Sequence, residues 1–225
     1  MRDVGDVMDG RYRLVRRLGD GVFRAEDLSL ARPVVVRVSG PEGAAGLARL
    51  TTVLRTLQYG TSHGVPVLDE GTTEDGGRYL VSPLVDGTPL SRIVPPGGRP
   101  IAADAAVSIG LALLEAAEAA RRAVPEGQGA IPAAAILDRD RELRVTRFTL
   151  DAGAEPAVCR AVGATLHQLL TGREPEAGES VRARGYPVPD PLADVVDAAL
   201  AGDLRTPAGM RHRLSAARRR VPRSG

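Results

Sequence analysis

The spacing of apolar residues changes near residue 86, and this change constrains the fold more than any other feature of the chain. Before it, apolar residues come in short runs bounded by Gly, Pro or Asp, at residues 12–18, 22–25, 33–38, 65–68 and 79–81. Such runs are typical of strands in an antiparallel sheet. One segment among them has apolar residues at helical spacing, which predicts a single amphipathic helix. Its apolar residues are Leu47, Leu50, Val53, Leu54 and Leu57.

After residue 86 the pattern is mainly helical. Residues 103–123, 158–170, 191–200 and 207–219 combine helical spacing with helix-forming composition. Between the first two of these segments, residues 135–137 and 143–148 flank a polar turn and predict a small hairpin. We therefore predict an α+β protein with a small β-rich lobe containing one helix, a larger helical lobe and a groove between them.

On this basis the chain divides into four segments. Residues 1–10 are an N-terminal extension, 11–85 the small lobe, 86–217 the larger lobe and 218–225 a basic tail. Residues 211–225 contain six arginines and no acid, so this end could meet anionic lipid or an acidic protein face. A solvated helix end is the simpler interpretation. We expect membrane contact to be peripheral at most, through the tail, and no nucleic-acid partner.

Cysteine, histidine and the chain start give no sign of a metal site or of secretion. Cys159 is the single cysteine, and the three histidines are too scattered to suggest shared ligation. Asp3 lies near the start of the sequence and no apolar run follows it, so nothing there resembles a secretory signal. Residues 101–123 are interrupted by charges, which excludes a membrane span there. We expect a cytoplasmic protein that binds no metal.

Five segments carry a family resemblance when taken in order. They are RYRLVRRLG at 11–19, RAED at 24–27, RPVVVRV at 32–38, YLVSPLVDG at 79–87 and GATLHQLLTGR at 163–173. Together they resemble the bacterial eukaryotic-type (Hanks-type) Ser/Thr protein kinases over roughly residues 10–217. The resemblance implies a bilobal protein-kinase-like fold with shortened loops, in which residues 79–87 would lie where that family receives adenine.

The resemblance also identifies positions in the small lobe that have lost the family's chemistry. Kinases cover the nucleotide phosphates with a long glycine-rich hairpin, but Gly19 and Gly21 are separated by one residue and run directly into a strand. This predicts a two-residue turn. Arg37 stands where the family has its ATP-binding lysine, and Leu50 stands about where the helix would offer the glutamate that holds that lysine.

The catalytic loop is degenerate in the same way. Counting back from the family's proline, the His-Arg-Asp motif falls on Gly127, Gln128 and Gly129, the following lysine on Ile131 and the magnesium-binding asparagine on Ala134. None of these residues can accept a proton or ligate a cation as the family's residues do.

The metal loop and its support are altered as well. Arg147 takes the place of the magnesium-binding aspartate before Phe148, so a cation replaces a ligand. Val158 stands where the next helix usually offers an aspartate that braces the catalytic loop. We predict that ATP and magnesium binding are lost.

The chain also contains no lysine and no asparagine, so all 30 of its basic residues are arginine. A GC-rich genome explains this loss on the surface. It does not make a planar, permanently charged guanidinium equivalent to a titratable ammonium at a catalytic position.

We therefore predict a catalytically inactive protein-kinase-like domain, a pseudokinase, that acts as a protein-binding scaffold or regulatory module in cytosolic signalling. Packing positions such as Leu18 and Leu166 stay apolar while the chemical positions are lost, whereas a decaying chain should lose both. The expected partner is a protein, for example an active kinase or a cell-envelope complex.

The alternative is an unconventional nucleotide- or phosphate-binding kinase-like protein with residual or atypical transferase activity. In this hypothesis Arg37 and Arg147 face one another and hold an oxyanion without metal, because arginine forks suit such groups. Either arginine could instead pair with a nearby acid: Glu26, Asp27 or Asp151.

Overall fold

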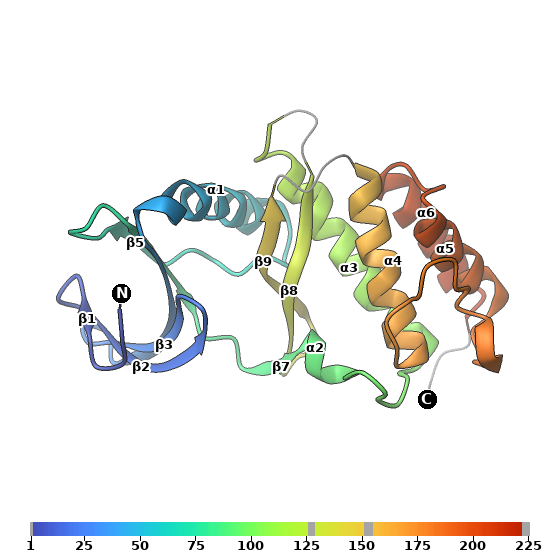
Figure 1. The fold of residues 1–225 in the computed structure, drawn as a ribbon, viewed down its shortest axis with the longest axis horizontal. Helices are drawn as coiled ribbons and strands as arrows, with labels where there is room; N and C mark the ends of the chain where they lie inside the picture. The colour runs from blue at the N-terminus through green and yellow to red at the C-terminus, as the bar shows by residue number, and fades with distance from the viewer. Residues whose placement is uncertain (1, 126–128, 151–154, 222–225) are drawn as a thin grey trace. The chain divides into compact units, whose positions relative to one another are not determined.

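The computed structural model describes residues 2–125, 129–150 and 155–221. The chain forms two compact units, residues 1–86 and 87–225 (Figure 1). They are called the N-terminal and the C-terminal unit below, and each is described by itself.

The N-terminal unit contains a six-stranded antiparallel sheet in the order β1-β2-β3-β4-β6-β5. Its strands are β1 (Val7–Met8), β2 (Tyr12–Gly19), β3 (Val22–Asp27), β4 (Arg32–Ser39), β5 (Asp69–Thr72) and β6 (Arg78–Pro83). Four of the five predicted strands are confirmed. The strand predicted at 65–68 is wrong, because Val65 is buried without joining the ladder and the pairing with β6 begins at Asp69.

The two faces of this sheet are covered differently. Alternate residues of a strand point to opposite faces, and one face carries a buried apolar cluster that includes Tyr12, Phe23 and Val36. Met8 joins that cluster, so residues 1–10 contribute a strand and a core side chain. Helix α1 (Ala44–Gly60), preceded by a short 3-10 turn (Pro41–Gly43), packs against β4 and β6.

A network of ion pairs connects the strands of the N-terminal unit. Asp27, whose side chain is fully buried, accepts two 2.8 Å hydrogen bonds from Arg11 and lies 3.5 Å from Arg32. Arg11 also lies 3.5 Å from Asp69 on edge strand β5, and the Tyr12 hydroxyl donates to the same carboxylate at 2.6 Å. Residues far apart in sequence are thereby joined across the sheet.

The Asp27 network predicts a specific dependence of stability on acid. The hydrogen bonds from Arg11 lower the pKa of Asp27 from 3.8 to about 2. The folded state therefore gains stability from this ionised group above pH 3.8, and that gain is lost as pH falls towards 2. We expect Asp27→Asn to lower the melting temperature by several degrees at neutral pH and to flatten its fall between these two pH values.

Circular dichroism melts from about pH 7 to pH 2 measure both effects. Glu26→Gln is the matched control. Glu26 is exposed, and its ion pair with Arg13 is long, at 3.8 Å, so it should add little stability. If Asp27→Asn and wild type lose stability in parallel as the solution is acidified, the assigned role of Asp27 is wrong.

The C-terminal unit is helical around a small sheet. Its helices are α2 (Leu90–Ile93), α3 (Ala103–Arg121), α4 (Glu155–Thr171), α5 (Asp190–Ala201) and α6 (Pro207–Arg218), with a short 3-10 turn (Ala183–Gly185). The sheet has the order β7-β8-β9, with β7 (Gly87–Pro89), β8 (Ala130–Asp138) and β9 (Leu143–Leu150). The four predicted helices are confirmed. None of the helices in the described part of the chain is long and apolar enough to span a bilayer.

Helix α3 is the centre of this unit and contacts both α4 and α6. Small residues allow close approach: a Cβ added to Gly163 on α4 would lie 2.7 Å from the Ala199 Cβ on α5. The loop before α5 is held by Asp197, which accepts hydrogen bonds from the Ser180 hydroxyl at 2.6 Å and from Arg182 at 2.9 Å. These contacts hold the loop against α5.

Candidate functional site

The β2–β3 turn is as short as the sequence predicts. Gly19 pairs with Val22, so only Asp20 and Gly21 form the turn. Gly21 has a φ of 60° and its carbonyl oxygen accepts a 2.7 Å hydrogen bond from the Val38 N–H. A Cβ at Gly21 would lie 2.4 Å from the Val38 oxygen. The turn is therefore held against β4, and its backbone is bonded within the sheet.

Arg37 and Leu50 lie on the opposite side of the sheet from the apolar cluster. Arg37 is half-buried in β4, paired in register with Val22 on one side and Leu80 on the other. Leu50 is 8% exposed on α1, among that helix's buried residues. The Leu50 side chain thus contributes packing and offers no charge to the neighbouring strand.

The charged side chains of α1 are all arginines. Its sequence contains no acid between residues 44 and 60. Arg55 of α1 donates to Glu70 of β5 at 3.0 Å, and Arg78 of β6 donates to the same carboxylate at 3.2 Å. The helix supplies the cation and the strand supplies the anion, so these pairs tie α1 to the sheet.

In the C-terminal unit, strands β8 and β9 run through the positions where the resemblance places the catalytic and metal loops. The hairpin is longer than the predicted one, because pairing continues from Leu137 and Leu143 to Ala130 and Leu150. Of the described residues that the resemblance aligns with the catalytic loop, Gly129 is buried just before β8, and Ile131 and Ala134 lie within the strand. The region has become a β-ladder.

The ladder places the candidate residues opposite one another. Ile131 pairs with Thr149, and Ala134 pairs directly with Arg147. A register shift beside Ala134 leaves Ala133 without a partner in the ladder, which is the geometry of a β-bulge. Arg147 is exposed on β9. A methyl group and a guanidinium thus lie opposite each other on adjacent strands, at the two positions that the sequence resemblance aligns with magnesium ligands.

Neighbouring positions are apolar or otherwise engaged. Phe148 is 6% exposed and Val158 on α4 is 3% exposed, so both serve the core. Beside Val158, burial raises the pKa of the Cys159 thiol to about 11, which keeps it protonated and unreactive at neutral pH. Among the residues described, no group of three His, Cys, Asp or Glu side chains could hold a metal ion.

Two of the three acids proposed as partners for Arg37 and Arg147 pair with other arginines. Glu26 lies 3.8 Å from Arg13, and Asp27 pairs with Arg11 and Arg32. Asp151 lies outside the described residues, as do Gly127 and Gln128 of the catalytic-loop stretch. Arg37 belongs to the N-terminal unit and Arg147 to the C-terminal unit.

The sequence did not predict a pocket of about 280 Å³ in the N-terminal unit. It lies at the β2–β3 turn and the end of β4, on the face that carries Phe23 rather than the face that carries Arg37. Its lining mixes the cations Arg2 and Arg17 with acids, and the Arg17 guanidinium lies 5.0 Å from the centre of the Phe23 ring. Its residues come from separate segments, so no local motif signals it.

No protein-family model matches this sequence, and no curated protein matches it. Solved structures do match. The kinase domain of Mycobacterium tuberculosis PknI superposes with a TM-score of 0.72 at 18% identity, covering 98% of this chain and all of that one. A cysteine-to-alanine mutant of the same domain superposes with a TM-score of 0.70 at 19% identity, covering 96% of this chain and 97% of that one. The chain has the bilobal protein kinase fold.

The two units of the chain correspond to the two lobes of the kinase fold. The small lobe of that fold is the antiparallel sheet with one helix, and the large lobe is the helical unit. The similarity spans nearly the whole chain, so the short β2–β3 turn and the β8–β9 ladder both lie within a kinase-like fold. At 18% identity the match shows the fold alone.

A glycine substitution tests how tightly the β2–β3 turn is held. Gly21→Ala adds both the strain of a positive φ and a methyl group 2.4 Å from a carbonyl oxygen. We expect a loss of about 2–4 kcal/mol in unfolding free energy by urea denaturation, the sum of backbone strain and overpacking.

Gly10→Ala is the matched control, because Gly10 has a φ of 61° but no atom within 4 Å of its added Cβ. It should lose only about 1 kcal/mol. Equal losses in the two variants would mean that the contact with β4 is not tight.

Proposed function

We propose that this chain is a pseudokinase: a kinase-like module that binds a protein partner or regulates it, without transferring phosphate. The observation that carries the proposal is the pairing of Ala134 with Arg147 in the β8–β9 ladder. In an active kinase, the corresponding loops bring a proton acceptor and metal ligands to one point. A ladder of alternating side chains that carries isoleucine, alanine and arginine at these positions has no such point.

The size of the chemical loss supports the proposal. Loss of a general base costs about 10²–10⁴ in rate, and loss of one preorganised electrostatic donor costs about 10²–10³. These losses are not simply additive. Base, metal ligands and the lysine of β4 are nevertheless all replaced, by residues that cannot move a proton or bind a cation. The one acid within β8 and β9, Asp138, accepts a 2.9 Å hydrogen bond from Arg144 at the far end of the ladder.

The nucleotide site is affected at the same time. The Asp20-Gly21 turn is bonded to β4 and is too short to wrap a triphosphate. Arg37 carries a charge where the family uses lysine, but α1 offers Leu50 and no carboxylate to hold it. We infer that ATP–magnesium is not a ligand and that the module acts in the cytoplasm through a partner such as an active kinase or a cell-envelope complex.

A direct test measures ATP binding with and without its metal. We expect no change in melting temperature, within about 1 °C, on adding millimolar ATP with magnesium, because a ligand stabilises only the state that binds it. We also expect no transfer of ³²P from labelled ATP to a generic substrate protein or to the chain itself. Magnesium-dependent stabilisation together with labelling would overturn the proposal.

The same assay distinguishes the alternative hypothesis. The exposure of Arg147 favours it, since an exposed guanidinium can bind an oxyanion. Stabilisation by ATP, AMP or inorganic phosphate without metal, lost in Arg147→Gln, would indicate a phosphate-binding protein. No stabilisation by any of the three, in wild type or variant, supports the module without a nucleotide.

A further inference from the structure

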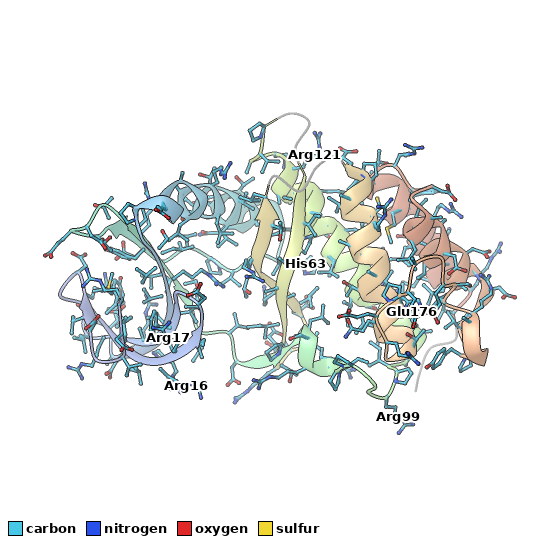
Figure 2. All side chains as sticks on the ribbon, in the orientation of Figure 1. Arg16, Arg17, His63, Arg99, Arg121 and Glu176 are labelled. Atoms are coloured by element: carbon cyan, nitrogen blue, oxygen red, sulfur yellow. The ribbon has the colours of Figure 1, made fainter. Side chains whose placement is uncertain are left out.

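Two arginines face each other across neighbouring strands of the N-terminal unit. Arg16 on β2 and Arg24 on β3 are partners in register, and both are exposed. They lie on the face opposite the apolar cluster, because the adjacent Arg17 lies over the Phe23 ring of that cluster. Arg16 and Arg17 can be located on β2 in Figure 2.

This arrangement costs stability. Side chains directly opposite in an antiparallel pair have Cβ atoms about 4.5–5.5 Å apart, and like charges there destabilise the sheet. Within residues 2–125, 129–150 and 155–221, no carboxylate forms an ion pair with Arg16 or Arg24. The next strand offers Val35 opposite Arg24, which is apolar. The repulsion is therefore not relieved inside the described part of the molecule.

Neighbouring residues on β2 add exposed apolar surface. Val15 is 46% exposed, and Leu18, which the sequence indicated as a packing position, is 44% exposed and so is not part of the core. The register is shifted between Leu14 and Arg16 and again between Arg17 and Gly19, and these shifts leave Val15 and Leu18 without a partner on β3. The two residues lie on either side of Arg16 along β2. The result is a strip of two guanidiniums flanked by two aliphatic side chains.

We propose that this strip, formed by Val15, Arg16, Leu18 and Arg24, is the docking surface for an acidic segment of a partner protein. Two opposed guanidinium forks match the oxygens of one Asp or Glu carboxylate, and such charge-assisted hydrogen bonds are the stronger kind. A carboxylate placed between them also removes the repulsion. Apolar residues beside that acid would cover Val15 and Leu18. The proposed function requires a protein partner, and this inference, which rests on that function, specifies the chemistry of the partner.

The first part of the test is stability. Arg24→Glu turns a like-charge pair into an opposite-charge pair, so we expect the melting temperature to rise by about 1–4 °C. Arg99→Glu is the matched control, because Arg99 is an exposed arginine of the other unit with no ion pair among the described residues. A fall in melting temperature for Arg24→Glu alone would show that Arg24 stabilises the sheet, and the proposal would fail.

The second part is binding to the full chain, measured by fluorescence anisotropy. The probe is a labelled peptide of alternating leucine and glutamate, and its control has glutamine in place of glutamate. We expect the acidic peptide to bind wild type and Arg99→Glu alike, and to bind Arg24→Glu and Arg16→Gln at least about ten-fold more weakly. Binding should also weaken with added salt.

Three outcomes would overturn the inference: equal binding of both peptides, unchanged binding by Arg24→Glu, or Arg24-dependent binding of phosphatidylserine vesicles without peptide binding. The last would indicate a lipid surface instead of a protein. Because these measurements use no ATP, a chain found to bind ATP–magnesium would lose its assignment as a pseudokinase, while the peptide result would still stand.

Discussion

Backbone pairing between β8 and β9 fixes the positions of the side chains that the resemblance aligns with the catalytic and metal loops. A catalytic loop must direct several polar groups to one point, whereas a ladder sends successive side chains to opposite faces. Once Ala134 is paired with Arg147, the backbone groups on both sides are committed to the sheet. The residue types suit this ladder, because alanine and isoleucine can lie in a strand that a cluster of buried acids would destabilise.

The N-terminal unit shows the same tendency. Its turn between β2 and β3 is bonded to β4 through Gly21 and Val38, so a segment that is a flexible cover in active kinases belongs to the sheet here. The Asp27 network then joins the strands at the other end of this sheet. In both units, the segments aligned with kinase loops thus form backbone hydrogen bonds within a sheet.

The elements that the sequence predicts correctly are those marked by the spacing of apolar residues or by the order of short motifs. The helices follow from apolar spacing, and the two-residue turn follows from Gly19 and Gly21 beside strand residues. Strand β5 was missed because it is an edge strand of polar residues, which give no apolar pattern. Some of these residues form ion pairs, such as Asp69 with Arg11. The extended β8 was missed because alanine and Pro132 have low strand propensity, and only pairing with β9 makes that stretch a strand.

Arginines that pair with carboxylates inside a unit differ from the two arginines of the strip proposed as a docking surface. Arg11 and Arg182 each bind more than one carboxylate and stabilise the unit that contains them. Replacement of surface lysine by arginine through genome composition preserves charge, so it leaves each cation beside whatever partner its position already had. It therefore explains the identity of Arg16 and Arg24 but not their placement opposite each other. A folded chain gains nothing from that repulsion alone, whereas a chain that binds an acidic partner gains affinity from it.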